Sequence, residues 1–161
     1  MKFINNSSDL AKFLSIKIIR QSKITNISTD TRGLKVGSLF FAIKGEQFNG
    51  NDYVEDALKK GASFVVTDSS RFKSTNDKNI IYVNNTIVAL RKIAKNILKT
   101  FNGDVIGITG SNGKTTTTKI ISSVLNKSSG TIKNYNNEIG MPLSIINANA
   151  NSKYLVIEMG A

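Results

Sequence analysis

The residues best suited to chemistry lie in Gly110–Thr116, which has the sequence GSNGKTT. Glycines let backbone N–H groups turn inward around phosphate oxygens, because no Cβ stands in the way. Lys114 could then bridge the β- and γ-phosphates of a nucleoside triphosphate, and the hydroxyl of Thr115 could bind Mg²⁺. The order of these residues therefore predicts a phosphate-binding loop.

The elements on either side of this loop support that prediction. Val105, Ile106 and Ile108 predict a short buried strand before the turn, and the residues after Lys114 have helical periodicity. The N-terminus of such a helix adds roughly half a positive charge, directed at the phosphates. The general pattern GxxxxGK[ST] has a glycine where this chain has Ile108, so the loop is a variant. The alternative is a Gly/Ser/Asn turn that happens to precede a lysine and a threonine.

A carboxylate follows a second predicted strand. Tyr154–Ile157 is an apolar run that leads directly to Glu158. In a doubly wound parallel sheet, ligands lie outside the carboxyl ends of the strands. We therefore expect Glu158 to meet Thr115 and to hold Mg²⁺ with it. The alternative is a solvated glutamate at a strand end.

Strands and helices alternate along the whole chain. Strands are predicted at residues 39–43, 63–67, 80–83, 105–108, 131–133 and 154–157. Helices are predicted after an N-cap at Ser8, at residues 53–60 after a cap at Asp52, from residue 85 or 86 to the Asn102-Gly103 stop, after the glycine turn, and around Pro142. The pattern predicts an α/β protein with a small N-terminal α/β domain at residues 1–83. Residues 84–161 would form the first part of a phosphate-loop, NTPase-like, parallel-sheet domain.

Composition limits the function classes. The 161 residues contain neither cysteine nor histidine, which excludes disulfides, thiolate metal sites and imidazole chemistry from this chain. No apolar run approaches a membrane span and no secretory signal is evident, so we expect a cytoplasmic monomer without stable membrane insertion. The net charge of +11 raises the alternative of a nucleic-acid-binding protein. Because the lysines are scattered and aromatic residues make up only 7%, we expect no nucleic-acid partner.

Three stretches together resemble the Mur ligase family, the ATP-dependent amide-forming enzymes of peptidoglycan assembly. Gly107–Thr118 is similar to the phosphate loop of that family and accounts for the missing glycine. Ser28–Tyr53 is similar to the N-terminal uridine-nucleotide domain of the later-acting members. Asn136–Ser144 and Val156–Ala161 most resemble the branch that adds D-Ala-D-Ala to UDP-N-acetylmuramoyl-tripeptide. One departure is Asn51, where the family commonly has a histidine.

The resemblance implies ATP and Mg²⁺ as cofactors and assigns residues to each ligand. It places Gly110, Ser111, Asn112, Gly113, Lys114, Thr115 and Thr116 around the ATP phosphates, with Lys114, Thr115 and Glu158 catalytic and the last two on Mg²⁺. It places Ser28, Asp30, Thr31, Arg32, Lys44 and Gly45 around the UDP part of the substrate, and Asn136 and Asn137 near the sugar-peptide or the γ-phosphate. Arg32 also suits a phosphate by its guanidinium fork, although it could be a simple surface turn residue. Asp30 suits a turn cap better than a base.

The implied reaction activates the tripeptide carboxylate as an acyl phosphate, which the amine of D-Ala-D-Ala then displaces. The family has three domains, so this chain would hold the first domain and the opening part of the second, and we expect it to be inactive alone. The alternatives are the tripeptide synthetase or a folylpolyglutamate-type ligase of the same family, and a non-catalytic phosphate-loop module. NNEIGMPL disfavours the tripeptide synthetase, and the uridine-domain stretch disfavours the folate type.

Overall fold

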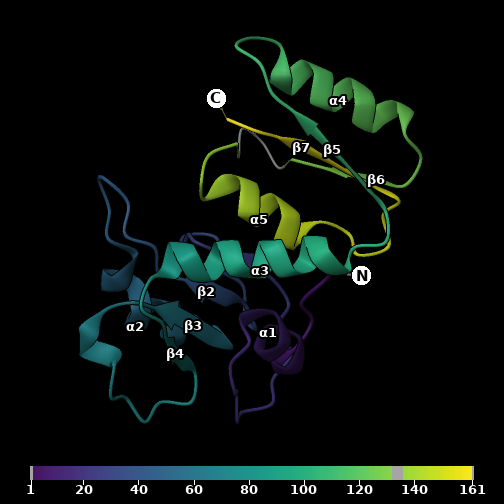
Figure 1. Cartoon of the computed structure of the whole chain (residues 1–161). Coiled ribbons are helices and arrows are strands. Elements are labelled where there is room, and N and C mark those ends of the chain that lie inside the picture. Colours follow the sequence, from purple (N-terminus) through teal and green to yellow (C-terminus); the bar gives the residue numbers. More distant parts are fainter. Residues whose placement is uncertain (1, 132–135, 161) are drawn as a thin grey trace. The chain divides into compact units, whose positions relative to one another are not determined.

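The computed structural model describes residues 2–131 and 136–160, which divide into two compact units (Figure 1). The first unit comprises residues 4–90, and the second comprises residues 91–160 with Lys2 and Phe3. The boundary falls inside helix α3, Thr86–Thr100. Each unit contains a parallel β-sheet with helices, which confirms the predicted α/β class. Among the described residues, none of the helices is long and apolar enough to cross a membrane.

The first unit is built on a four-stranded parallel sheet whose strands follow the order of the sequence. The strands are β1 (Ile27–Ser28), β2 (Leu39–Phe41), β3 (Phe64–Thr67) and β4 (Ile80–Tyr82). The helices are α1 (Ser7–Leu14), the 3₁₀ turn η1 (Gly50–Tyr53), α2 (Val54–Lys59) and the 3₁₀ turn η2 (Ser70–Phe72). Every residue of β2 and β3 is buried, as continuous apolar runs predict for central strands of a parallel sheet.

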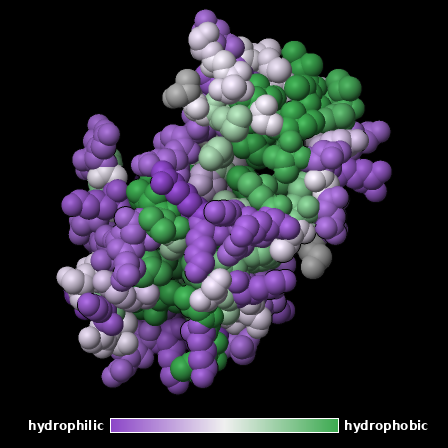
Figure 2. Space-filling view, viewed as in Figure 1, coloured by the Kyte–Doolittle hydropathy of each residue, from purple (hydrophilic) through white to green (hydrophobic). Residues whose placement is uncertain are grey.

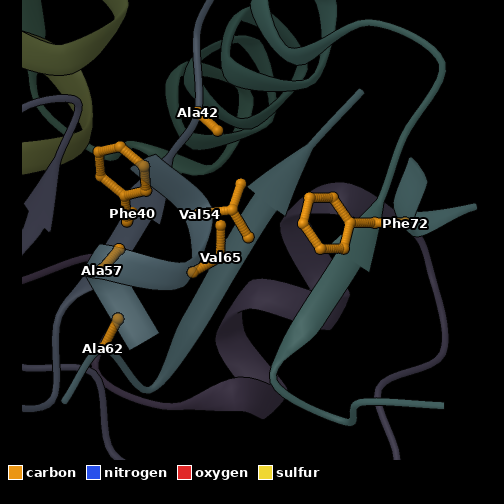
Figure 3. Packing of buried hydrophobic residues seen from close by; sticks show 7 residues of the cluster. All are labelled: Phe40, Ala42, Val54, Ala57, Ala62, Val65 and Phe72. Atoms are coloured by element: carbon orange, nitrogen blue, oxygen red, sulfur yellow. The ribbon is translucent and has the colours of Figure 1, made fainter. Parts of the chain in front are cut away.

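A compact cluster on one face of this sheet fixes α2 (Figure 3). Phe40 of β2 and Val65 of β3 are register partners, so their side chains point to the same face. Val54 and Ala57 of α2 pack against them, and Phe72 of η2 closes the cluster. The three-residue step from Val54 to Ala57 is the helical spacing that puts both on one side of α2.

Two helix caps differ from the predictions. The cap of α1 is Asn6, whose side-chain oxygen accepts from the backbone N–H of Asp9 at 3.0 Å, so Ser8 lies inside the helix. Asp52, predicted to cap the helix at residues 53–60, lies within η1, which Asn49 caps. Helix α2 begins at Val54 after Tyr53, and no side chain caps it. In both places two or more capping residue types stand close together, and the chain direction before the helix decides which one has the required extended backbone.

The second unit has a three-stranded parallel sheet in the order β5-β7-β6. Its strands are β5 (Asp104–Ile108), β6 (Ser128–Gly130) and β7 (Tyr154–Glu158), and its helices besides α3 are α4 (Lys114–Val124) and α5 (Gly140–Asn147). Of the strand predicted at residues 131–133, only Thr131 is described, and it lies just after the end of β6 at Gly130; residues 132 and 133 lie outside the described residues. Pro142 is in the first turn of α5, as predicted.

Strand β5 is an edge strand, so the prediction that it is buried is wrong. In the described chain β5 pairs only with β7, and Val105 remains 48% exposed. Ile120 and Val124 of α4 are also exposed. Figure 2 shows hydrophobic residues gathered on the visible surface of this unit. An apolar run alone cannot distinguish a central strand from an edge strand, because both faces of the strand need cover before it is buried.

Candidate nucleotide-binding site

The loop between β5 and α4 depends on glycine at two positions. Gly110 has φ 146° and Gly113 has φ 75°, and side chains other than hydrogen rarely tolerate these values. A Cβ at Gly113 would meet nothing within 4 Å, so the requirement there is conformational and not steric. Gly107 has a different reason: a Cβ would come within 2.8 Å of the terminal methyl of Met159. Gly110 and Gly113 thus shape the turn between β5 and α4.

Lys114 is the first residue of α4. Its Nζ donates to the backbone carbonyl of Gly110 at 2.5 Å, so the ammonium group lies over the loop. The helix begins after Gly113, which has no side chain that could cap the first N–H groups. The first N–H groups of an α-helix have no intrahelical partners, and together with the helix dipole they attract an anion. The loop therefore presents both an ammonium group and backbone donors at one place.

Thr115 and Glu158 meet across the ends of neighbouring strands. Ile108 and Glu158 are register partners of β5 and β7, which brings the loop after β5 next to the end of β7. The hydroxyl of Thr115 donates to Oε2 of Glu158 at 2.9 Å. Only 2% of Glu158 is exposed. Glu158 is thus a buried, hydrogen-bonded carboxylate and not the solvated strand-end residue of the alternative.

Two further residues hold the carboxylate strand in place. The side-chain amide of Asn136 donates to Oε1 of Glu158 at 2.8 Å. The backbone N–H of Glu158 donates to the hydroxyl of Thr131 at 2.7 Å. Residues from three segments therefore converge on Glu158, and the carboxylate oxygens both have a donor.

A cavity of about 770 Å³ lies beside these groups. It is lined by Arg91, Lys114, Asn136, Asn137, Glu138, Met141, Met159 and Gly160. Arg91 and Glu138 form an ion pair at this cavity. The sequence predictions placed Lys114 at the ATP phosphates, and Asn136 and Asn137 near the sugar-peptide or the γ-phosphate. All three line this cavity. Gly110, Ser111, Asn112, Thr115 and Thr116 belong to the adjoining loop and helix start.

Asn137 has a local structural task. Its side-chain oxygen accepts from the backbone N–H of Gly140 at 2.8 Å and from that of Ile139 at 3.3 Å. Asn137 thereby supports the first turn of α5, which is the usual use of an asparagine before a helix. Its neighbour Asn136 instead faces Glu158. The sequence prediction gave the two asparagines the same role, but their surroundings in the structure differ.

The residues predicted for the uridine nucleotide lie after β1 and β2 of the first unit. Ser28 ends β1, and its hydroxyl accepts from the backbone N–H of Asp30 at 3.0 Å. Asp30 accepts from the backbone N–H of Arg32 at 2.9 Å, which makes it a turn cap. The guanidinium of Arg32 also donates to both carboxylate oxygens, and it lowers the pKa of Asp30 to about 2. The side chain of Arg32 is 89% exposed.

The other residues predicted to bind the uridine nucleotide lie at the same edge of the sheet. Thr31 is buried, and its backbone carbonyl accepts from Nζ of Lys60 at 3.1 Å. Lys44 and Gly45 form the turn after β2, where the N–H of Gly45 donates to the carbonyl of Phe48 at 2.8 Å. Because β1 and β2 are parallel neighbours, both turns leave the sheet at its carboxyl edge.

Two models of protein domain families match this chain, and both describe domains of Mur ligases. "Mur ligase family, catalytic domain" matches residues 23–101, and "Mur ligase middle domain" matches residues 108–161. The chain belongs to the Mur ligase family. The resemblance seen in the three sequence stretches is thereby confirmed.

Several individual Mur ligases are similar to this chain over most of its length. The UDP-N-acetylmuramoyl-tripeptide–D-alanyl-D-alanine ligase of Bacillus subtilis (strain 168) is 40% identical over 146 residues, which are 87% of this chain and 31% of that protein. The crystal structure of MurF ligase from Thermotoga maritima in complex with ADP is 34% identical with a TM-score of 0.73, covering 84% of this chain and 32% of that one. The MurF structure from Acinetobacter baumannii is 26% identical with a TM-score of 0.82, covering 100% and 36%. This chain spans about a third of the length of the relatives it matches.

The sequence predictions missed five of the residues that line this cavity, and two of those five, Arg91 and Glu138, are charged. Glu138 lies within the NNEIG stretch, so its position was an available signal, but Arg91 lies in α3 without any motif. Their ion pair joins residues 47 positions apart. A pairing over that separation becomes visible only when the fold is known.

A polar network after β3 was also missed. Asp68 accepts from the N–H and the hydroxyl of Thr86, both at 3.0 Å, and from the amide of Asn51 at 2.9 Å. Burial raises the pKa of Asp68, but these hydrogen bonds outweigh it and leave the pKa below its ordinary value. Asn51, which departs from the usual histidine of Mur ligases, also accepts from the hydroxyl of Thr67 at 2.6 Å. In this chain the position therefore serves to connect β3 with the start of α3.

Proposed function

We propose that this chain supplies the uridine-nucleotide-binding and ATP-phosphate-binding parts of an ATP-dependent ligase that joins D-Ala-D-Ala to UDP-N-acetylmuramoyl-tripeptide. The observation that carries the proposal is the contact of Thr115 with the buried Glu158, beside Lys114 and at the edge of the cavity. The names of the similar relatives support the dipeptide-adding reaction over that of the tripeptide synthetase.

ATP phosphates would bind at the loop before α4. Gly110 and Gly113 leave room for backbone donors to face the phosphate oxygens, and Lys114 would exchange the carbonyl of Gly110 for the β- and γ-phosphates. The similar MurF ligase from Thermotoga maritima forms a complex with ADP, which supports this use of the loop.

Mg²⁺ fits the donor set of Thr115 and Glu158. A hydroxyl and a carboxylate are hard oxygen ligands, and Mg²⁺ is usually bound by one or two such groups together with phosphate oxygens and water. Their oxygens are already 2.9 Å apart, so both lie on the same side of the loop. When bound, Mg²⁺ would neutralise charge that develops on the transferred phosphoryl group.

The chain's own residues would contribute position and charge to the reaction. The substrate carboxylate has to approach the γ-phosphate in line with the leaving oxygen, although both groups are negative. Lys114 would reduce that repulsion, and Arg91, which also lines the cavity, has its charge balanced by Glu138. Neither residue has to transfer a proton, because formation of an acyl phosphate requires none.

The UDP part of the substrate would bind at the turns after β1 and β2, which carry Ser28, Asp30, Thr31, Arg32, Lys44 and Gly45. Asp30 uses Nε and one Nη of Arg32, which fixes the plane of the guanidinium. The remaining donors of Arg32 are then available to a phosphate oxygen. A fixed guanidinium loses less conformational freedom on binding than a free one.

Binding of ADP in the presence of Mg²⁺, measured by calorimetry, tests the proposal. We expect Thr115→Val to weaken binding about tenfold or more, because one ligand of the ion is lost. Thr117→Val is the matched control, since Thr117 is an exposed threonine of the same helix. Equal effects of the two variants, or no ADP binding by the unaltered chain, would contradict the proposed site.

Two further measurements separate the ligase from the other function classes. We expect UDP-N-acetylmuramoyl-tripeptide to bind to this chain, which a phosphate-loop module without ligase function would not do. We expect no phosphate release when this chain is given ATP and both substrates, because it has only about a third of the length of its relatives. Turnover by this chain, or affinity for DNA that falls steeply with salt, would count against the proposal.

A further inference from the structure

Asn136 is connected to the end of β7 at two points. Its side-chain amide donates to Oε1 of Glu158 at 2.8 Å. Its backbone carbonyl accepts from the N–H of Gly160 at 2.7 Å. One residue therefore contacts both sides of the short segment that begins with the carboxylate, and its own position is fixed by the backbone.

Gly160 is required for this close approach. A Cβ at Gly160 would come within 2.8 Å of the carbonyl oxygen of Asn136, which is closer than real contacts allow. The backbone of residue 136 can thus lie against the end of β7 only because residue 160 is glycine. This packing keeps the amide of Asn136 within reach of Glu158.

The two oxygens of Glu158 have different partners. Oε1 accepts from Asn136 and Oε2 accepts from Thr115. An ionised carboxylate can only accept hydrogen bonds, so the nitrogen of the Asn136 amide must be the atom that faces it. Because Glu158 is buried, no bulk water is available to replace a missing donor at Oε1. The two donors together fix the rotation of the carboxylate about its terminal bond.

We propose that Asn136 is a positioning residue for Glu158. It occupies Oε1 and thereby holds Oε2 toward Thr115 and the phosphate loop. This assignment differs from the contact with substrate or γ-phosphate that the family resemblance implied for Asn136. Its consequence for ion binding rests on the proposed function, since a divalent ion bound with the nucleotide would meet a single carboxylate oxygen in a fixed direction.

Crystal structures of two variants test the geometric part without any ligand. In Asn136→Ala we expect the carboxylate to rotate, so that the distance from the Thr115 hydroxyl to the nearest oxygen of Glu158 exceeds about 3.5 Å, the limit of a hydrogen bond. Asn147→Ala is the matched control, because the amide of Asn147 also donates a hydrogen bond, to the carbonyl of Leu143 at 3.0 Å. We expect this control to keep the 2.9 Å contact between Thr115 and Glu158.

Calorimetry with ADP tests the consequence for the ion. We expect Asn136→Ala to lower ADP affinity about tenfold with Mg²⁺ present, the effect of losing one hydrogen bond to a charged group. With EDTA in place of Mg²⁺, we expect a change of less than about twofold, because Asn136 acts on the ion ligand and not on the phosphates. A purely structural role would reduce both affinities equally. Asn136→Gln keeps the amide and is expected to restore part of the Mg²⁺-dependent affinity.

The outcomes separate this proposal from the proposed function. If Thr115 and Glu158 remain in contact in Asn136→Ala, the positioning role is overturned, whatever the chain binds. If the unaltered chain binds no ADP, the proposed function fails, while the crystal structures still decide the role of Asn136. If Asn136→Ala does not fold, Asn136→Ser carries the same expectation, because a serine hydroxyl is too short to reach Oε1.

Discussion

Replacement of Lys114 by alanine is the most direct perturbation of the phosphate loop. In the free chain, Nζ of Lys114 donates to the carbonyl of Gly110 at 2.5 Å. A bound nucleotide would have to replace this contact with phosphate oxygens. The lysine therefore contributes to affinity only by the difference between its contacts in the bound and free states, and not by the full strength of its phosphate contacts.

That difference can be worked out from the contacts. Two charge-assisted hydrogen bonds to the β- and γ-phosphates would replace one charge-assisted hydrogen bond to Gly110. The net gain is about one such bond, or about 1.5–3 kcal/mol. We therefore expect Lys114→Ala to raise the Kd for ADP or ATP about 10- to 150-fold. The fold should survive, because Gly110 is only half-buried and water can replace the ammonium group at its carbonyl.

Calorimetry of the two variants Lys114→Ala and Lys119→Ala provides the measurement. Lys119 is an exposed lysine of the same helix, so both variants lose the same charge from α4. We expect Lys119→Ala to change nucleotide affinity less than about twofold, since an exposed charge acts only through screened, long-range attraction. Binding of UDP-N-acetylmuramoyl-tripeptide should be unchanged in both. Nucleotide binding by Lys114→Ala within about threefold of the unaltered chain would refute the assignment of the loop.

Three further predictions concern the rest of the fold. Asp68→Ala should lower the free energy of unfolding by about 1–3 kcal/mol, because the start of α3 loses its acceptor. Since the pKa of Asp68 is lowered on folding, its contribution is present above its ordinary pKa and lost as the pH falls through the folded value; urea unfolding at several pH values measures both, and a pH-independent difference would contradict the prediction. By NMR, Asp30 should titrate near pH 2 in the chain and closer to 3.8 in Arg32→Gln, and an unchanged titration would exclude the ion pair. Leu155→Ala should cost about 2–5 kcal/mol and Val105→Ala less than about 1 kcal/mol, since Leu155 is fully buried and Val105 is 48% exposed; equal costs in urea unfolding would show that β5 is covered.

The elements that the sequence predicted well are those with a strong local pattern. Leu39–Phe41 is wholly apolar, Phe64–Thr67 begins with three apolar residues, and both are central strands. Strand β6 shows the limit of this reasoning. Ser128–Gly130 has no preference for strand structure, and it pairs because β7 offers a free edge beside it. Gly130 also fits a tight place, since a Cβ would come within 2.9 Å of the hydroxyl of Ser122.

In the candidate site, too, a local pattern predicts some residues, whereas others become evident only from the fold. Lys114 and Thr115 follow from a motif whose residues are adjacent in sequence, and Glu158 follows from the rule that ligands bind at carboxyl ends of parallel strands. The partners of these residues could not be predicted, because Asn136 and Glu158 meet only after α5 has returned the chain to the sheet. A local sequence pattern identifies the chemistry that is present. Contacts between residues far apart in the sequence decide which side chain holds another in its orientation. That is why most of the uridine residues and Asn136 were assigned by resemblance alone.

The distribution of acidic residues explains how the proposed phosphate site could contain carboxylates. Residues 91–160 contain only three acidic side chains, Asp104, Glu138 and Glu158. Asp104 begins β5, at the end of the sheet away from the loop, whereas the other two are near the cavity and are held by donors. Arg91 pairs with Glu138, so that carboxylate adds no net repulsion, and Glu158 would remain as the oxygen ligand for the proposed divalent ion. The chain's net charge of +11 would attract a polyphosphate from a distance. Added salt should therefore slow nucleotide association, because the attraction exerted by scattered surface lysines acts at long range and is screened.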